Sequence, residues 1–101
     1  MRRGTTPWIE LILDGCEDIG AYKTILITLQ QGTIEINKSK EELTIEENVI
    51  RFQLTQEETL GFKRGKTVQI QLRAVDESGN AIASDIITAS VSDVLNEEVI
   101  T

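Results

Sequence analysis

Pairs of neighbouring carboxylates are the residues of this chain that could do chemistry. Two carboxylates facing a bound sugar can serve as general acid and as base or nucleophile, which is how most glycosidases work. Here each pair lies in a predicted turn, a helix start or the C-terminal tail, where solvated charge is the ordinary state. We therefore expect no enzymatic activity and no catalytic residue. The pairs are Glu41-Glu42, Glu46-Glu47, Glu57-Glu58, Asp76-Glu77 and Glu97-Glu98.

Other catalytic and cofactor sites need residues that the chain lacks. It has no histidine and a single cysteine, Cys16. This excludes the usual serine and cysteine triads, an intrachain disulfide and zinc sites built on paired thiolates. Acidic neighbours disfavour the thiolate of Cys16, so we expect low reactivity. The segment 61–65 has neither the spacing nor the ending of a phosphate-binding loop, and we expect no cofactor.

Two acidic loops, 14–18 and 76–80, could offer oxygen ligands to calcium. Neither matches the ligand spacing of an EF-hand. We therefore predict no metal site. An adhesin-like domain tuned by calcium is nevertheless one of the functional hypotheses.

The charge balance bears on the partners. Seventeen acidic and ten basic residues give a formal net charge of −7. Such a surface repels phosphate backbones, and the basic pairs Arg2-Arg3 and Lys63-Arg64 are too small for a nucleic-acid footprint. No apolar run approaches the ~18 residues of a transmembrane helix, and no signal-peptide core follows Met1. We expect no nucleic-acid partner, no membrane partner and no small-molecule ligand.

The alternation of apolar and polar residues predicts strands. The chain has 101 residues, and its apolar share of 40% consists mostly of Ile, Leu and Val. The clearest pattern is in 67–75, where every second residue is apolar, as in a sheet with one solvated face. Strands are expected at 8–13, 21–30, 33–38, 43–45, 49–54, 67–75 and 81–94, the last with a bulge near 85–87 where the alternation changes phase.

A short helical turn near residues 56–61 is the one helix expected. Thr55 followed three residues later by Glu58 is a capping box, which accounts for Glu57 and Glu58 without catalysis. These elements predict a single domain, 1–101, with flexible ends at 1–7 and 95–101. The expected fold class is all-β and mainly antiparallel: an Ig-like β-sandwich of about seven strands, lacking the Cys…Trp…Cys pattern of true Ig domains.

The segment 8–13 is apolar on both faces, interrupted by Glu10. One face of this strand is therefore expected to meet a partner or a loop. We predict a possible interaction surface at Trp8, Ile9 and Leu11. Packing against the protein is favoured over sugar stacking for Trp8, because isolated aromatic residues usually pack.

Several stretches resemble a known group of proteins. They are the opening Met1–Pro7, the segment Leu54–Phe62, the strand Val68–Arg73 after Gly65-Lys66, and the ending Ser90–Leu95. Together they resemble small uncharacterised Firmicutes prophage proteins and, more distantly, the Ig-like N-terminal domain of phage baseplate upper proteins. The resemblance covers most of the chain, and the receptor-binding region that follows this domain in baseplate proteins is not in this sequence.

The resemblance implies a non-enzymatic structural module of a phage or prophage particle, associated with the tail or baseplate. Its expected location is the virion or the cytoplasm of the bacterial host. It would bind a protein partner or a second copy through strand edges. The alternative is a carbohydrate- or cell-wall-binding sandwich that uses Trp8 and Tyr22 as stacking platforms.

Overall fold

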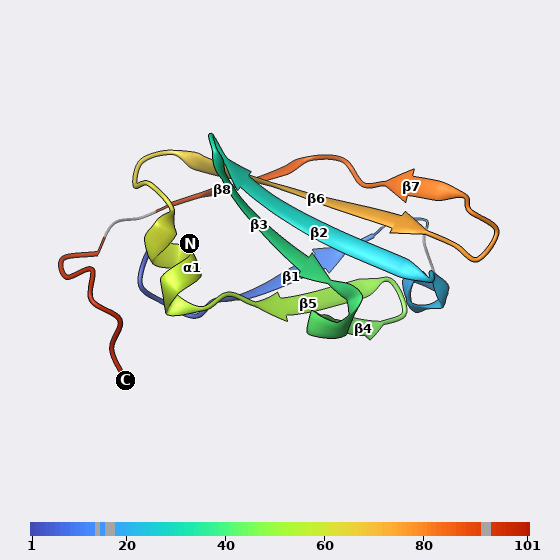
Figure 1. The fold of residues 1–101 in the computed structure, drawn as a ribbon, viewed down its shortest axis with the longest axis horizontal. Coiled ribbons are helices and arrows are strands. Elements are labelled where there is room, and N and C mark those ends of the chain that lie inside the picture. Colours follow the sequence, from blue (N-terminus) through green and yellow to red (C-terminus); the bar gives the residue numbers. More distant parts are fainter. Residues whose placement is uncertain (14, 16–17, 92–93) are drawn as a thin grey trace.

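The fold is a two-layer, mainly antiparallel β-sandwich, as expected (Figure 1). The computed structural model describes residues 1–13, 15, 18–91 and 94–101. A three-stranded sheet has the order β1 (Trp8–Ile12), β5 (Val49–Gln53), β4 (Thr44–Glu46). A five-stranded sheet has the order β3 (Ile34–Ser39), β2 (Thr24–Gln31), β6 (Thr67–Val75), and β6 also pairs with both β7 (Ala81–Ala83) and β8 (Ile87–Ser90). The helices are α1 (Gln56–Gly61) and the 3₁₀ turns η1 (Ile19–Ala21) and η2 (Lys40–Glu42).

The core lies between the inner faces of the two sheets. Residues that pair directly across an antiparallel ladder share a face, so the registers extend the period-two pattern from strand to strand. Ile27 of β2 pairs with Leu72 of β6, and Ile9 of β1 pairs with Phe52 of β5. The alternation predicted for 67–75 and 49–54 is confirmed. The buried side chains at the centre are Ile25, Ile27, Leu29, Ile50, Phe52, Leu54, Val68, Ile70, Leu72 and Ala74.

The last predicted strand is divided by the bulge expected near 85–87. Between the pairs Arg73↔Ala83 and Ile70↔Ile87, β6 advances three residues while the β7–β8 segment advances four. The extra residue is the definition of a β-bulge. It splits one long edge strand into β7 and β8, so the part of the chain that the structure describes has eight strands instead of about seven.

The β6–β7 hairpin is held by the side chain of Asp76. Its Oδ1 accepts hydrogen bonds from the backbone N–H groups of Ser78 and Asn80, each at 2.9 Å. Gly79 has a φ of +86°, the left-handed conformation expected of it. The hydrogen bonds from Asn80, together with those from Ser78 and Gly79, lower the pKa of Asp76 and outweigh the opposing effect of desolvation.

The helical turn at α1 begins with the predicted capping box. The Thr55 hydroxyl accepts from the Glu58 N–H at 3.1 Å, and the Glu58 carboxylate accepts from the Thr55 N–H at 2.9 Å. The two capping bonds satisfy donors that a helix start leaves open. The prediction that Glu58 caps this helix is therefore confirmed.

Both chain ends make contacts with α1 or with the residues just before it. Thr59 Oγ1 donates to the carbonyl of Thr5 at 2.9 Å, and Leu54 N–H donates to the carbonyl of Pro7 at 3.1 Å. At the other end, the Gln56 side chain donates to the Ile100 carbonyl at 2.6 Å and accepts from the Ile100 N–H at 2.8 Å. The N-terminal and C-terminal segments thus lie at the same end of the molecule, as Figure 1 shows.

Candidate interaction surface

Strand β1 separates the three residues of the predicted interaction surface. Trp8 lies on the outer face of the three-stranded sheet and is 63% exposed. Ile9 and Leu11 alternate with it and face the core; Ile9 is half-buried and Leu11 is 4% exposed. Leu11 packs in the core, so its inclusion in a surface patch is corrected. Ile12, which was not part of the predicted interaction surface, faces outward and is 59% exposed.

Charged residues lie between the two exposed apolar side chains of β1. Arg51 of β5 donates from Nε to Glu10 at 2.9 Å, and its Nη1 lies 3.7 Å from the carboxylate of Glu46 on β4. All three side chains belong to the outer face, because Glu10 pairs with Arg51 and Arg51 pairs with Thr44. The outer face of this sheet therefore presents Trp8 and Ile12, about 13 Å apart at the strand rise. Between them lies a row of two carboxylates, Glu10 and Glu46, that share the guanidinium of Arg51.

Trp8 and Tyr22 do not share a face. Trp8 pairs with Gln53, the last residue of β5. Tyr22 follows η1, which hydrogen-bonds to Glu47 just before the start of β5, and its half-buried side chain packs against the core. The two rings therefore lie at opposite ends of the sandwich and do not form one stacking platform.

Arg3 of the first basic pair lies near the second pair, Lys63-Arg64, beside α1. Arg3, Lys63 and Arg64 line one shallow depression together with Glu97. The Arg3 guanidinium donates to Glu97 at 2.7 Å and to the carbonyl of Leu60 at 2.8 Å. Arg3 is thus engaged in fastening the tail to the helix, and the depression contains an acidic group beside its basic ones.

The acidic loops give no metal-binding cluster in the described part of the chain. Among residues 1–13, 15, 18–91 and 94–101, no three His, Cys, Asp or Glu side chains gather where they could hold an ion. In the loop 76–80, the oxygens of Asp76 accept bonds from the hairpin itself. Three residues of the loop 14–18, Cys16 among them, lie outside the described residues.

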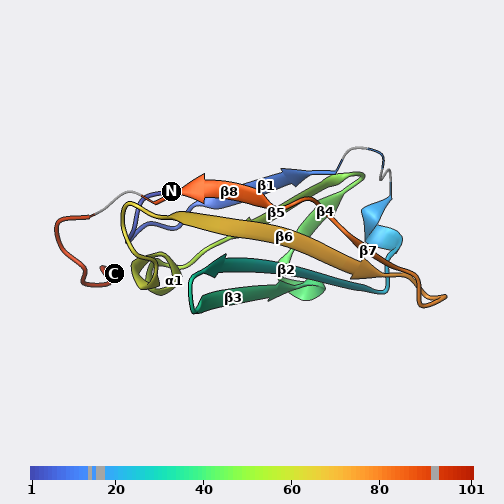
Figure 2. The same ribbon diagram turned by 90° about the horizontal axis from the view of Figure 1, so that it is seen from above.

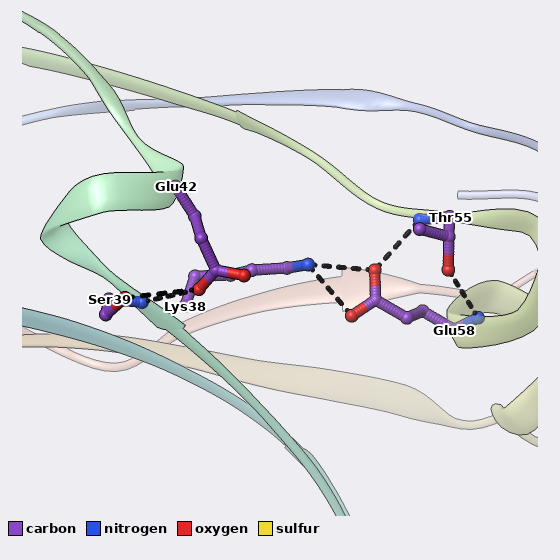
Figure 3. A network of polar contacts seen from close by, with 5 residues as sticks. All are labelled: Lys38, Ser39, Glu42, Thr55 and Glu58. Atoms are coloured by element: carbon purple, nitrogen blue, oxygen red, sulfur yellow. Dashed lines mark hydrogen bonds and ion pairs between the residues drawn. The ribbon is translucent and has the colours of Figure 1, made fainter.

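A polar contact that was not predicted from the sequence links β3 of the larger sheet to α1 (Figure 3). Lys38, the last residue of the strand predicted at 33–38, is 8% exposed and lies on the inner face of β3, where it pairs with Ile27. Its Nζ lies 2.9 Å from each carboxylate oxygen of Glu58. Burial raises the pKa of Glu58, but the hydrogen bonds from Lys38 and Thr55 together outweigh it, so the pKa is lowered overall.

Comparison with known proteins identifies no family. No family model matches the chain, and no curated protein matches it at a significant level. In the described residues, no helix has the length and apolar character needed to cross a membrane.

Proposed function

We propose that this chain is a non-enzymatic interaction module of a phage or prophage particle, associated with its tail or baseplate. The observation that carries the proposal is the exposure of Trp8 on β1, an edge strand of the three-stranded sheet. Exposed aromatic side chains on a rigid sheet are typical centres of protein–protein interfaces. The resemblance to prophage and baseplate proteins supports the same class of function.

The edge position of β1 supports contact through strand pairing. An edge strand presents backbone N–H and C=O groups to whatever lies beside it, and another chain can complete the ladder. The outer side chains of β1 would then decide which partner fits. A protein partner or a second copy is the proposed ligand, with no cofactor and no nucleic acid.

The proposal is tested by asking whether the chain is part of the particle. Particles are induced from the bacterium that encodes it, purified on a density gradient and probed with an antibody against the chain. We expect the wild-type protein to travel with the particles and Trp8→Ala to be depleted from them. Leu95→Ala is the matched control, because Leu95 is fully exposed in the C-terminal tail. Wild-type protein that is absent from the particles would refute the virion role.

A further inference from the structure

The two flanks of the sandwich are built differently. At the β3 edge, the Lys38–Glu58 ion pair spans from the larger sheet to α1 and covers the core with polar groups. The opposite edge of the larger sheet is formed by β7 and β8. Figure 1 places β8 and β1 in different layers, and Figure 2 shows that both lie along this same flank.

On this flank, side chains that face inward are left uncovered. Ile82 pairs with Ala74 and Ile87 pairs with Ile70, so each isoleucine shares its partner's inner face. Ala74 and Ile70 are 2% and 3% exposed, whereas Ile82 and Ile87 are 38% and 43% exposed. The apolar interior therefore opens to solvent within the width of one strand.

A groove of about 440 Å³ follows this opening between the end of β1 and the β7–β8 segment. Its volume is within the range of roughly 300–1,000 Å³ of ligand-binding pockets. Apolar side chains from both layers form most of its walls. The lining residues are Ile12, Leu13, Leu72, Ile82, Ala83, Ser84, Asp85 and Ile87.

Strand edges border the groove on both sides, which favours an extended peptide over a compact small molecule. β1 is an edge strand of one sheet, and β7 and β8 form an edge of the other. The bulge between Ala83 and Ile87 interrupts the second edge, and bulges discourage further pairing. The edge of β1 is therefore the one suited to receive another strand.

Charge selects among the possible peptides. Among the described residues that line the groove, only Asp85 has an ionisable side chain, and it is exposed. The chain's own tail carries Glu97 and Glu98, which would bring like charges together. The basic N-terminus is not available either, because Arg3 binds Leu60 and Glu97. A second copy also has a net charge of −7, so the complementary occupant is a different, basic chain.

We propose that this groove accepts an extended segment of a partner protein, with alternating apolar side chains and a Lys or Arg beside Asp85, which adds a strand to the edge of β1. The inference rests on the proposed function as an interaction module and names the chemistry of its partner. Apolar side chains of the segment would cover Ile82 and Ile87, and its backbone would continue the three-stranded sheet.

Two labelled peptides test the proposal, KVTVTVK and its acidic twin EVTVTVE, by fluorescence polarisation with the full chain. We expect the basic peptide to bind about tenfold more tightly than the acidic one. Asp85→Lys should reverse that preference. Glu77→Lys is the matched control, because it makes the same charge change in the exposed β6–β7 hairpin, outside the groove lining. Ile87→Thr, which keeps a β-branched side chain, should weaken both peptides.

The location is checked by amide chemical-shift changes on adding KVTVTVK, which we expect in β1 and not in β3. The proposal is overturned by equal affinity for the two peptides, by equal effects of the two lysine variants, or by shifts confined to β3. Concentration-dependent dimers that Ile87→Thr abolishes, without peptide binding, would make a second copy the occupant and overturn it as well. If the peptides bind as expected but the chain is absent from purified particles, only the virion role is refuted.

Discussion

The ammonium group of Lys38 lies 2.9 Å from both carboxylate oxygens of Glu58, which also caps the start of α1 (Figure 3). One carboxylate thus serves the helix cap and the link between the larger sheet and α1. The side chains are 10% and 23% exposed, so solvent screens the pair only in part. Hydrogen bonds to charged groups are worth about 1.5–3 kcal/mol when little exposed, and the residual exposure of Glu58 places this one at the lower end.

Glu58→Gln is therefore expected to lower the free energy of unfolding by about 1–2 kcal/mol. Glutamine keeps the size of the side chain and can still accept from Thr55, but it offers no charge to Lys38. The measurement is urea unfolding at neutral pH. Glu57→Gln, a change at an exposed neighbour in the same helical turn, is the control and should remain within about 0.5 kcal/mol of the wild type. Equal effects of the two substitutions would contradict the assigned role.

A double-mutant cycle isolates the ion pair itself. Lys38→Met keeps the apolar stem packed against the core and removes the ammonium group. Combined with Glu58→Gln, we expect a coupling free energy of about 1 kcal/mol, since the two groups are in direct contact. Additive effects in unfolding experiments would show that Lys38 and Glu58 act independently. Near-ultraviolet circular dichroism of each variant checks that the fold is retained.

The lowered pKa of Glu58 makes stability depend on pH in a defined direction. Glu58 ordinarily titrates near pH 4.5 and has a lower pKa when folded, so the unfolded chain takes up its proton first as the pH falls. Its contribution is complete above pH 4.5 and is lost as the pH falls through the folded value. The difference in unfolding free energy between wild type and Glu58→Gln should therefore shrink from neutral pH towards pH 3. A constant difference would disprove the linkage.

Gln31 forms a second polar clamp that the sequence did not reveal. It is 6% exposed; its Nε2 donates to the carbonyl of Lys63 at 2.9 Å, and its Oε1 accepts from the Lys63 N–H at 2.6 Å. Gln31→Ala leaves both backbone groups without this partner and should cost about 1–3 kcal/mol. Gln30→Ala, on the exposed face of the same strand, should change the unfolding free energy by less than about 0.5 kcal/mol. A comparable loss in both variants would refute the clamp.

Local patterns were sufficient for much of the sandwich, because one-sided burial imposes a period of two. The strand Thr67–Val75 was predicted with its full bounds, and the phase change after Ser84 marked the bulge. The capping box at Thr55 located α1. A similar signal was overlooked at Ser39, where Glu42 accepts from the backbone N–H of Ser39 at 2.9 Å in η2. The pattern S-x-x-E could have located that turn.

The burial of Lys38 could not be predicted from local sequence patterns. It occupies an inner position of β3, but lysine in a polar run reads as solvated unless its partner is known. That partner, Glu58, is twenty residues away and on another element. The open groove was equally hidden, since Ile82 and Ile87 look like ordinary core residues. Their exposure depends on which strands of the opposite sheet reach them, a property of the assembled layers.

Trp8 and Leu11 offer the clearest separation of surface from core on one strand. Trp8→Ala removes a side chain that is 63% exposed and should change the unfolding free energy by less than about 1 kcal/mol. Leu11→Ala leaves a cavity beside the buried Ile50 and should cost about 2–4 kcal/mol. Partner binding should respond in the opposite order, with Trp8→Ala weakening it while Leu11→Ala, where folded, does not. Urea unfolding and binding to the isolated partner check the two rankings, and a Trp8→Ala variant as unstable as Leu11→Ala would place the indole in the core.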